Sequence, residues 1–177
     1  MTSPRITVAL SVYNNAAYLA LALDSILAQS FTDFELLAVN DGSSDASPAI
    51  LDRYAASDPR VRVIHQSNQG LIPSLNRIIA EARAPYIARM DGDDIAHPDR
   101  FAQQIAFLEA HPDHGVVGTR VFGITETGDL RRDWRIDHRV RRNRCTRGWP
   151  APVPSLRHDA QRSGACGRRL SRGLSPL

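Results

Sequence analysis

Phe34-Glu-Leu-Leu-Ala-Val-Asn-Asp-Gly-Ser43 joins a short apolar run directly to four residues that favour a turn. Short apolar runs bounded by turn residues are typical of buried strands. The same pattern occurs at Ile6–Asn15 and at Tyr86–Asp94. The stretches between these runs carry apolar residues at helical spacing, for example Leu19, Leu23 and Ile26. The chain therefore begins with strands and helices in alternation.

The alternation is expected to continue to about residue 124. The expected strands are residues 6–12, 34–39, 61–64, 86–90 and 115–124, and the expected helices are residues 16–29, 48–56, 72–82 and 98–110. Ser47 is expected to cap the second helix, with Pro48 at its first position. Alternating strands and helices with short connections predict an α/β fold with a mostly parallel sheet flanked by helices.

Polar residues follow four of these strands. They are Tyr13-Asn-Asn15, Asn40-Asp-Gly-Ser43, Asn68-Gln-Gly70 and Asp91-Gly-Asp-Asp94. In open parallel sheets, ligands bind outside the carboxyl ends of the strands, near a reversal in strand order. The four loops are therefore expected to converge on one edge and to form the functional site there.

Asp91-Gly-Asp-Asp94 places three carboxylates within four residues. They repel one another unless a positive charge lies among them. Asp91 and Asp93, two residues apart, would face one ion together if the segment is extended. Mg²⁺ is often held by one or two carboxylates together with substrate phosphates. Metal binding is the favoured interpretation, and a solvated turn with Asp94 capping the next helix is the alternative.

Asp41 and Tyr13 each leave two interpretations open. Asp41 is either a hydrogen-bond acceptor for a nucleotide base or ribose, or an ordinary turn residue. Tyr13 either stacks on a flat base or completes the core. The chain contains no G-x-G-x-x-G after its first strand, no phosphate-binding G-x-x-x-x-G-K-[ST] and no G-x-S-x-G. It also contains no apolar run long enough to be a transmembrane segment.

The charge divides the chain into two parts. Residues 1–130 hold 9 arginines and 16 acidic residues, whereas residues 131–177 hold 13 arginines and 3 acidic residues. We expect a folded domain over residues 1–130 and an arginine-rich tail over residues 131–177 that is disordered or read out of frame. Nucleic-acid binding through this tail is an alternative function, but the less favoured one.

The chain resembles family 2 glycosyltransferases of the GT-A fold over roughly residues 5–124. The resemblance rests on an ordered set of motifs: Val8–Asn14, Leu23–Ser30, Asn40–Asp45, Asn68–Gly70, Tyr86–Asp94 and His97–Phe101. It implies that residues 1–130 form a partial GT-A nucleotide-sugar-binding domain. It also implies an inverting, metal-dependent transfer of sugar from a nucleotide-diphosphate-sugar, commonly a UDP-sugar. Asp41 would hold the uracil or ribose, and Tyr13 would lie near the base. Asp91 and Asp93 match the two acids of the family's D-x-D motif and would hold Mg²⁺ or Mn²⁺, with Asp93 as the first choice.

The resemblance further implies an unidentified carbohydrate or lipid-linked acceptor, and a cytoplasmic location, either free or at the inner membrane face. A nucleotidyltransferase on a related sheet is a further alternative, but no glycine-rich basic loop follows the first strand.

The family's catalytic base, an aspartate on a later segment, has no counterpart here, because Asp133, Asp137 and Asp159 lack the matching context. In this family a His-Pro-Ser and a Gly-Gly-Tyr sequence usually precede the base. The genetic code allows codons for Pro154–Ala160 and Gly167–Ser175 that encode these two sequences when they are read one nucleotide later. We therefore expect the GT-A fold to be incomplete at its C-terminus, the reading frame to be lost after about residue 138, and transfer activity to be impaired.

Overall fold

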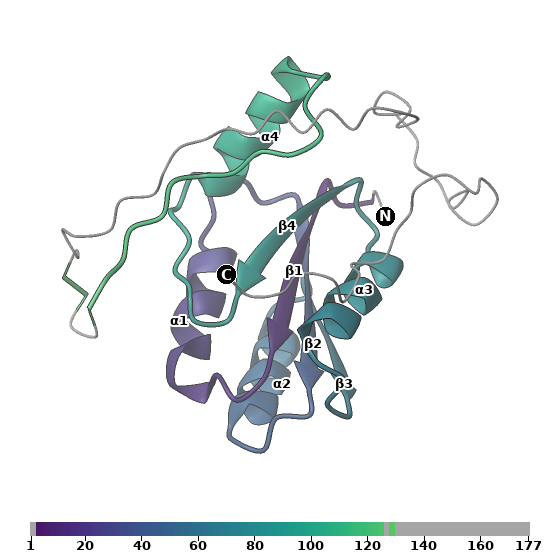
Figure 1. The fold of residues 1–177 in the computed structure, drawn as a ribbon, viewed down its shortest axis with the longest axis vertical. Helices are drawn as coiled ribbons and strands as arrows, with labels where there is room; N and C mark the ends of the chain where they lie inside the picture. The colour runs from purple at the N-terminus through teal and green to yellow at the C-terminus, as the bar shows by residue number, and fades with distance from the viewer. Residues whose placement is uncertain (1–2, 126–127, 130–177) are drawn as a thin grey trace, which may run out of the picture.

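The computed structural model describes residues 3–125 and 128–129. The expectations about residues 131–177 lie outside this range. Strands and helices alternate as expected (Figure 1). In chain order they are β1 (Ile6–Val12), α1 (Ala16–Leu27), β2 (Phe34–Asp41), α2 (Ser47–Ser57), β3 (Val61–Gln66), α3 (Leu71–Glu81), β4 (Tyr86–Asp91) and α4 (Arg100–Ala110).

The four strands form a parallel sheet in the order β3-β2-β1-β4. The chain therefore builds the sheet outward from β1 to β3, then crosses back to place β4 on the other side of β1. This reversal lies between β1 and β4, where Ser11 pairs with Asp91. The prediction of a mostly parallel α/β sheet flanked by helices is confirmed.

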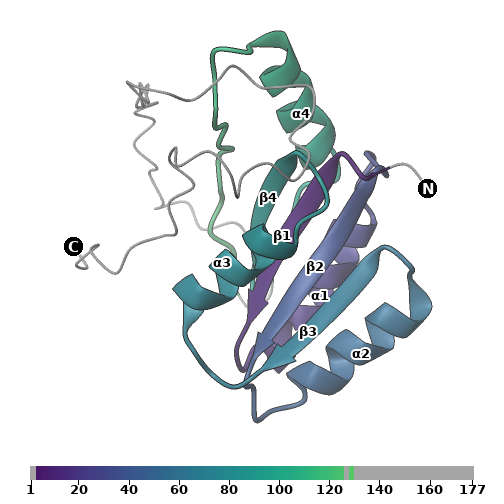
Figure 2. The same cartoon turned by 90° about the vertical axis from the view of Figure 1, so that its right-hand side faces the viewer.

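Side chains alternate between the two faces of the sheet, and each face is covered by different helices. The larger cluster contains alternate β1 residues, such as Val8 and Leu10, together with buried residues of α1, α2 and α4. The smaller cluster contains Ala9, Leu37 and Val39 beneath Leu75 and Ile78 of α3. Figure 2 shows α3 on one side of the sheet and α1 and α2 on the other.

Helix α4 joins the larger cluster through Phe101, whose ring meets that of Phe34 edge to face with centroids 5.6 Å apart. Gln29, which is 3% exposed, fixes the segment before this helix. Its Nε2 donates to the carbonyl of His97 over 2.7 Å, and its Oε1 accepts from the Phe101 amide over 3.1 Å. These contacts connect the end of α1 to the start of α4.

The fifth expected strand, residues 115–124, is a wrong prediction. Only Ile124 takes part in a strand-like bridge, and the rest of the segment is irregular. Val116 and Phe122 are 85% and 71% exposed, so their apolar side chains gain nothing from burial. An apolar run becomes a strand only when a neighbouring strand accepts its backbone hydrogen bonds, and within the described residues this segment has no such neighbour.

Several boundaries also differ from expectation. Strand β2 continues to Asp41 and β3 to Gln66, because the parallel pairing between them extends to these two residues. Within the described part of the chain, no helix is long and apolar enough to cross a membrane.

Candidate functional site

The loops after β1 and β2 are joined by hydrogen bonds. The Asn14 amide donates to Ser43 Oγ over 3.0 Å, and Asn14 Oδ1 accepts from the Ser44 amide over 2.8 Å. Asn14 has a φ of 52°, in the left-handed region that asparagine tolerates better than most residues. The first two of the four polar loops therefore converge, as predicted.

The loop after β2 also caps α1. Asp45 Oδ2 accepts from the Ala16 amide over 2.9 Å, and Ser47 Oγ accepts from the Asn15 amide over 3.0 Å. A carboxylate at a helix N-terminus satisfies free amides and interacts favourably with the helix dipole. Ser47 was expected to cap α2, but it is the first residue of that helix, with Ala46 at the cap. Its hydroxyl oxygen instead accepts the hydrogen bond from Asn15, on the loop after β1, 32 residues earlier in the chain.

The loop before α3 lies directly against the turn after β2. A Cβ atom at Gly42 would lie 2.6 Å from the Asn68 amide nitrogen, and Gly42 has a φ of +73°. Glycine is needed here for both its backbone angle and its small size. Gly92 lies close to Asn15 in a similar way, with its hypothetical Cβ 3.3 Å from Asn15 Cγ. Contacts therefore connect all four polar loops at the carboxyl edge of the sheet.

Asp41 lies at the end of β2, 2% exposed. Its carboxylate accepts hydrogen bonds from Gln66 Nε2 (2.8 Å), the Gln69 amide (2.9 Å) and the Gly70 amide (2.7 Å). Burial alone would raise the pKa of Asp41, but these hydrogen bonds hold it below its ordinary value of 3.8. Asp41 therefore stays ionised at neutral pH and shapes the loop before α3.

A second set of linked polar side chains lies near this edge, and the sequence analysis did not predict it. Asn40 is 5% exposed; its Nδ2 lies 3.0 Å from His65 Nδ1, and His65 Nε2 lies 3.0 Å from Asp52 Oδ1. Asn40 Oδ1 also accepts from the Ser43 amide over 3.1 Å. His65 gave no signal in the sequence, because its two partners come from β2 and α2 and only the fold brings them together.

Asp91 ends β4 and pairs with Arg89, whose Nη2 lies 2.8 and 3.0 Å from its two oxygens. Asp93 and Asp94 are exposed, and Asp93 has no hydrogen-bond or ion-pair partner among the described residues. Partial burial, together with the nearby Asp91 and Asp93 charges, raises the pKa of Asp94. This loop therefore concentrates negative charge that the protein only partly neutralises.

Arg100 contacts the strand that leads into residues 91–94, which we call the acidic loop. Its Nη2 donates to the Arg89 carbonyl over 2.8 Å, and its Nη1 lies 3.1 Å from Met90 Sδ. Burial lowers the pKa of Arg100 while the Asp94 and Asp91 charges raise it, and an arginine remains protonated under all ordinary conditions. In the sequence Arg100 stood out only as part of the His97–Phe101 motif.

The acidic loop can hold a metal ion only with help from a ligand. Within residues 3–125, no group of three or more His, Cys, Asp or Glu side chains is arranged to hold a metal ion. The expectation that an extended segment aims Asp91 and Asp93 the same way is wrong, because β4 ends at Asp91 and Asp93 lies in a turn. Two exposed carboxylates nevertheless fit the usual Mg²⁺ arrangement, in which phosphate oxygens and water complete the shell.

Tyr13 is 53% exposed on the loop after β1. It therefore does not complete the core, which was one of its two interpretations. Its amide lies 3.3 Å from Asn15 Oδ1, so the loop that carries it is anchored while the ring stays accessible.

Asp41 and Asp91 lie on the same face of the sheet, the one that α3 covers. Asp41 follows Val39 by two residues, and Asp91 pairs with Ser11, which follows Ala9 by two residues. Both Ala9 and Val39 belong to the cluster beneath α3. The fold thus brings the acidic loop and Asp41 to the same edge, on either side of β1.

Comparison with known proteins identifies relatives of this chain. EpsE of Bacillus subtilis, named as a glycosyltransferase, is 39% identical over 129 residues, which cover 72% of this chain and 46% of EpsE. A chondroitin synthase of Escherichia coli is 35% identical over 96 residues, covering 54% of this chain and 14% of the synthase. The chain thus spans less than half the length of these two relatives.

Solved structures share the fold. S. aureus TarS, crystallised as residues 1–349 with UDP, has a TM-score of 0.56 and 25% identity over 60% of this chain and 32% of TarS. The mannosyltransferase PcManGT of Pyrobaculum calidifontis, solved with GDP-Man and Mn²⁺, has a TM-score of 0.56 and 24% identity, covering 61% of this chain and 33% of that one. These likenesses confirm the predicted GT-A fold.

The profile described as glycosyl transferase family 2 matches residues 7–166. This match includes every motif on which the resemblance rested and extends beyond residue 130, so the domain boundary at that position stays a prediction. The chain belongs to glycosyl transferase family 2.

Proposed function

We propose that the chain binds a nucleotide-diphosphate-sugar, and specifically a UDP-sugar, at the carboxyl edge of its sheet. One observation carries the proposal: Asp41 and the Asp91–Asp94 loop flank the end of β1 on one face, at the reversal in strand order. This is where open α/β sheets bind nucleotides. The TarS structure with UDP and the PcManGT structure with GDP-Man and Mn²⁺ lend support by analogy.

On the β2 side, Asp41 would accept a hydrogen bond from the base or ribose. Its low pKa keeps it an acceptor at neutral pH. Tyr13 would stack its exposed ring on the base. Because the ring lies outside the core, this contact would not disturb the packing there.

On the β4 side, Asp91 and Asp93 would hold Mg²⁺ or Mn²⁺ against the diphosphate. The ion would neutralise the charge that develops on the diphosphate leaving group. Asp93 is open for this role, whereas Asp91 must first exchange its contact with Arg89. Arg100 would hold the backbone of β4 in place beneath them.

The transfer step itself is also part of the proposal. An acceptor hydroxyl, on a carbohydrate or a lipid-linked carbohydrate, would attack the anomeric carbon with inversion, assisted by a general base. The reaction would take place in the cytoplasm or at the inner face of the membrane. We propose that this chain is impaired in transfer, because no aspartate stands in the context of the family's base.

Calorimetric titration of the full chain with UDP, with and without Mn²⁺, tests the donor site. We expect Mn²⁺-dependent binding that weakens more than about tenfold in Asp93→Ala, because a charged metal ligand is lost. Asp33→Ala is the matched control, since this exposed aspartate precedes β2 at the opposite end of the sheet. A chain that circular dichroism shows to be folded, but that does not bind UDP, would contradict the proposal.

The nucleotide sequence of the gene tests the proposed loss of reading frame. Pro154 must be encoded by CCA, since the shifted frame has no histidine there otherwise. Leu170 must be encoded by CTA or TTA, followed by a TCN codon for Ser171, to yield the tyrosine. Any other codon at either site rules the idea out.

A further inference from the structure

The Asn40 side chain connects β3 to the turn that follows β2. Its Oδ1 accepts a hydrogen bond from the Ser43 amide over 3.1 Å. A backbone amide can only donate, so the oxygen of the Asn40 side chain must face Ser43 and its nitrogen must face the other way. That nitrogen, Nδ2, lies 3.0 Å from Nδ1 of His65, which pairs with Asn40 in the register of β2 and β3. The fold therefore fixes which end of the buried side-chain amide meets the imidazole.

This arrangement requires a neutral His65 and selects one of its tautomers. Asn40 Nδ2 donates, so His65 Nδ1 must carry a lone pair rather than a proton. The proton of the neutral ring is then on Nε2, which lies 3.0 Å from Asp52 Oδ1 and donates to that carboxylate. His65 thus accepts a hydrogen bond from Asn40 and donates one to Asp52.

A protonated His65 could not keep both contacts. An imidazolium carries a proton on each ring nitrogen, so its Nδ1 would present a donor to the Nδ2 donor of Asn40. Turning the Asn40 amide over would place its nitrogen against the Ser43 amide, again donor against donor. Moving the ring away would leave Nδ2 without its acceptor. Because Asn40 is 5% exposed, water has little access to replace the lost hydrogen bond.

Ser43 connects this arrangement to the loop after β1. Its Oγ accepts from the Asn14 amide over 3.0 Å, and the adjacent Ser44 amide donates to Asn14 Oδ1 over 2.8 Å. Tyr13, the candidate for stacking on the base, directly precedes Asn14. A turn that Asn40 no longer holds would therefore loosen the loop that carries Tyr13.

Asp52 is the charged side chain that contacts His65. It lies on α2, which packs against β3. The next residue of the helix, Arg53, has its guanidinium over the Tyr54 ring, 5.6 Å from the centroid. The Asp52 carboxylate can accept a proton from Nε2 in both charge states of the ring, so the donor of Asn40 is what distinguishes the two states.

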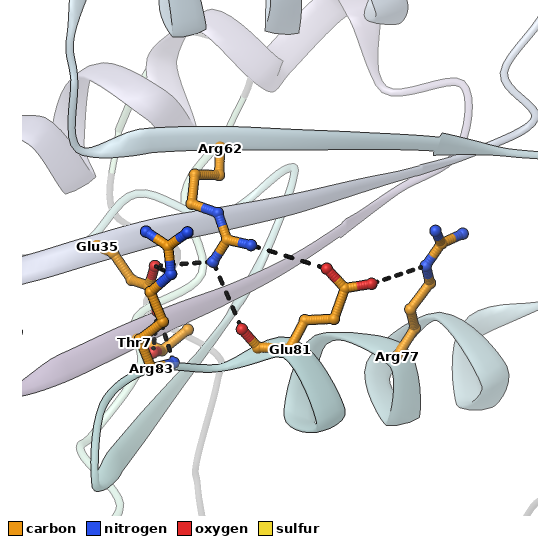
Figure 3. Close-up of polar contacts among 6 residues, drawn as sticks. All are labelled: Thr7, Glu35, Arg62, Arg77, Glu81 and Arg83. Carbon is orange, nitrogen blue, oxygen red and sulfur yellow. Dashed lines mark hydrogen bonds and ion pairs between the residues drawn. The ribbon is translucent and has the colours of Figure 1, made fainter.

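The charged residues of β2 and β3 lie on the opposite face of the sheet. Arg62 of β3 contacts Glu35 of β2 and Glu81 of α3, as Figure 3 shows. Asp41 is on that face as well, where it accepts from Gln66. Because side chains alternate between the two faces of a sheet, the strands separate these groups from the imidazole.

Two carboxylates near the turn keep their charge in mild acid. Burial alone would raise the pKa of Asp41, but its hydrogen bonds hold it below the ordinary 3.8. Desolvation alone would raise the pKa of Asp45, but hydrogen bonds from the Ala16 amide and from Ser47 hold it below 3.8 as well. Both stay ionised at pH 5, so neither would cause a change in this turn between pH 8 and pH 5.

We infer that His65 is a positioning residue whose neutral form holds the turn after β2 through Asn40, and whose protonation releases that turn. Histidine side chains ordinarily change charge between about pH 5 and 8. The consequence for the ligand rests on the proposed function: a released turn loosens the Tyr13 loop, so UDP binding weakens in mild acid.

NMR of the full chain without nucleotide tests the role of His65. Nitrogen-15 spectra identify the tautomer, and we expect a proton on Nε2 at pH 8. Hydrogen exchange measures the protection of the Ser43 amide relative to a free amide at the same pH, so the intrinsic pH dependence of exchange cancels. Protection should be about tenfold lower at pH 5 than at pH 8, because one buried hydrogen bond is lost.

Substitutions separate protonation from other effects of acid. His65→Asn keeps an acceptor near the position of Nδ1 but cannot be protonated, so protection should be equal at the two pH values. His65→Leu removes the acceptor, so protection should be low at both. Asn40→Asp should reverse the pH dependence, because a carboxylate accepts from the Ser43 amide and from an imidazolium together.

His111→Asn is the matched control. It makes the same substitution at a histidine whose ring stacks on that of Phe107, and it should keep the wild-type pH dependence. The wild-type exchange profile needs no variant, so the inference can be tested even if a variant does not fold.

Calorimetric titration with UDP and Mn²⁺ at pH 8 and pH 5 tests the consequence for the ligand. The affinity of wild type divided by that of His65→Asn should be about threefold lower at pH 5 than at pH 8. Protonation of UDP itself affects both proteins equally and cancels in this ratio.

The outcomes separate the role of His65 from the proposed function. Equal protection of the wild-type Ser43 amide at the two pH values, or a neutral ring with its proton on Nδ1, would overturn the inference. An affinity ratio that does not change with pH would overturn its link to the ligand. A chain with the expected protection that does not bind UDP would contradict the proposed function and leave the role of His65 in the turn supported.

Discussion

The two sides of the carboxyl edge differ in how completely the protein satisfies their charges. On the β2 side, Asp41 is 2% exposed and receives three N–H donors. On the β4 side, the Asp91 side chain is 46% exposed and has one arginine partner, while Asp93 has none among the described residues. On the β2 side the charge is offset by hydrogen bonds from within the protein, whereas the β4 side keeps a surplus of negative charge.

This contrast indicates how the two sides would meet a ligand. A carboxylate held by backbone amides is already oriented, so binding there requires little reorganisation. A cluster of partly unpaired carboxylates is destabilised by its own repulsion, and a cation would relieve it. In the proposed function, the β2 side would position the base or ribose and the β4 side would hold the metal ion.

The largest expected effect comes from Gly42, one of the two glycines that bring the loops together. Gly42→Ala should lower the free energy of unfolding by about 3 kcal/mol, because the new Cβ meets backbone at 2.6 Å and the φ of +73° is strained for alanine. Gly92→Ala on the β4 side should cost only about 1 kcal/mol, since its Cβ meets the movable Asn15 side chain. Urea unfolding measures both. Equal costs would mean that the two sides are equally rigid.

Asp41→Asn should lower the free energy of unfolding by about 2 kcal/mol at pH 7, because an amide group cannot accept from all three donors. The pKa of Asp41 is lower in the folded state than its ordinary 3.8, so ionised Asp41 stabilises the fold above that pH. This stabilisation is lost as pH falls through the folded-state pKa, and wild type and variant should converge there. Urea unfolding as a function of pH, with Asp33→Asn as the control, checks this. A constant difference down to acid pH would argue against the assignment.

Arg89→Met should raise the affinity for Mn²⁺ without nucleotide about threefold, because Arg89 and the cation compete for Asp91. Electron paramagnetic resonance of free Mn²⁺ measures the affinity directly. Arg53→Met on α2 is the matched control, as its guanidinium lies over the Tyr54 ring and far from the acidic loop in the sequence. Unchanged or weaker Mn²⁺ binding in Arg89→Met would mean that Asp91 takes no part.

Asp94→Asn should have the smallest effect and the opposite sign to Asp41→Asn. The pKa of Asp94 is raised in the folded state by burial and by its acidic neighbours, so its ionised form costs stability at neutral pH. The variant should be more stable than wild type at pH 7 by less than about 1 kcal/mol, with no difference below pH 3.8, where the carboxyl is protonated in both states. A destabilised variant at pH 7 would show that Asp94 has a favourable partner.

Four strands and four helices could be predicted from the sequence because their signals are local. The Ile6–Val12 run is apolar and has no competing helical pattern, and turn residues follow it immediately. Residues 115–124 carry a similar apolar pattern but form no strand, because the pattern does not show whether a neighbouring strand is present. The turn sequence after β2 pointed to Asp41 as a candidate. The three N–H groups that donate hydrogen bonds to it, however, come from a segment 25 to 29 residues further along the chain.

The sequence by itself determined the alternation of elements, the family, and the four loops that meet at one edge. Each can be inferred from residue types and short spacings alone, without knowing which distant residues are in contact. Only the tertiary structure decided that Ser47 and Asp45 serve α1, that Gly42 fits against Asn68, and that Gln66 fills one oxygen of Asp41. These contacts join residues 25 to 32 positions apart, and they exist because parallel pairing brings the ends of β1, β2 and β3 side by side.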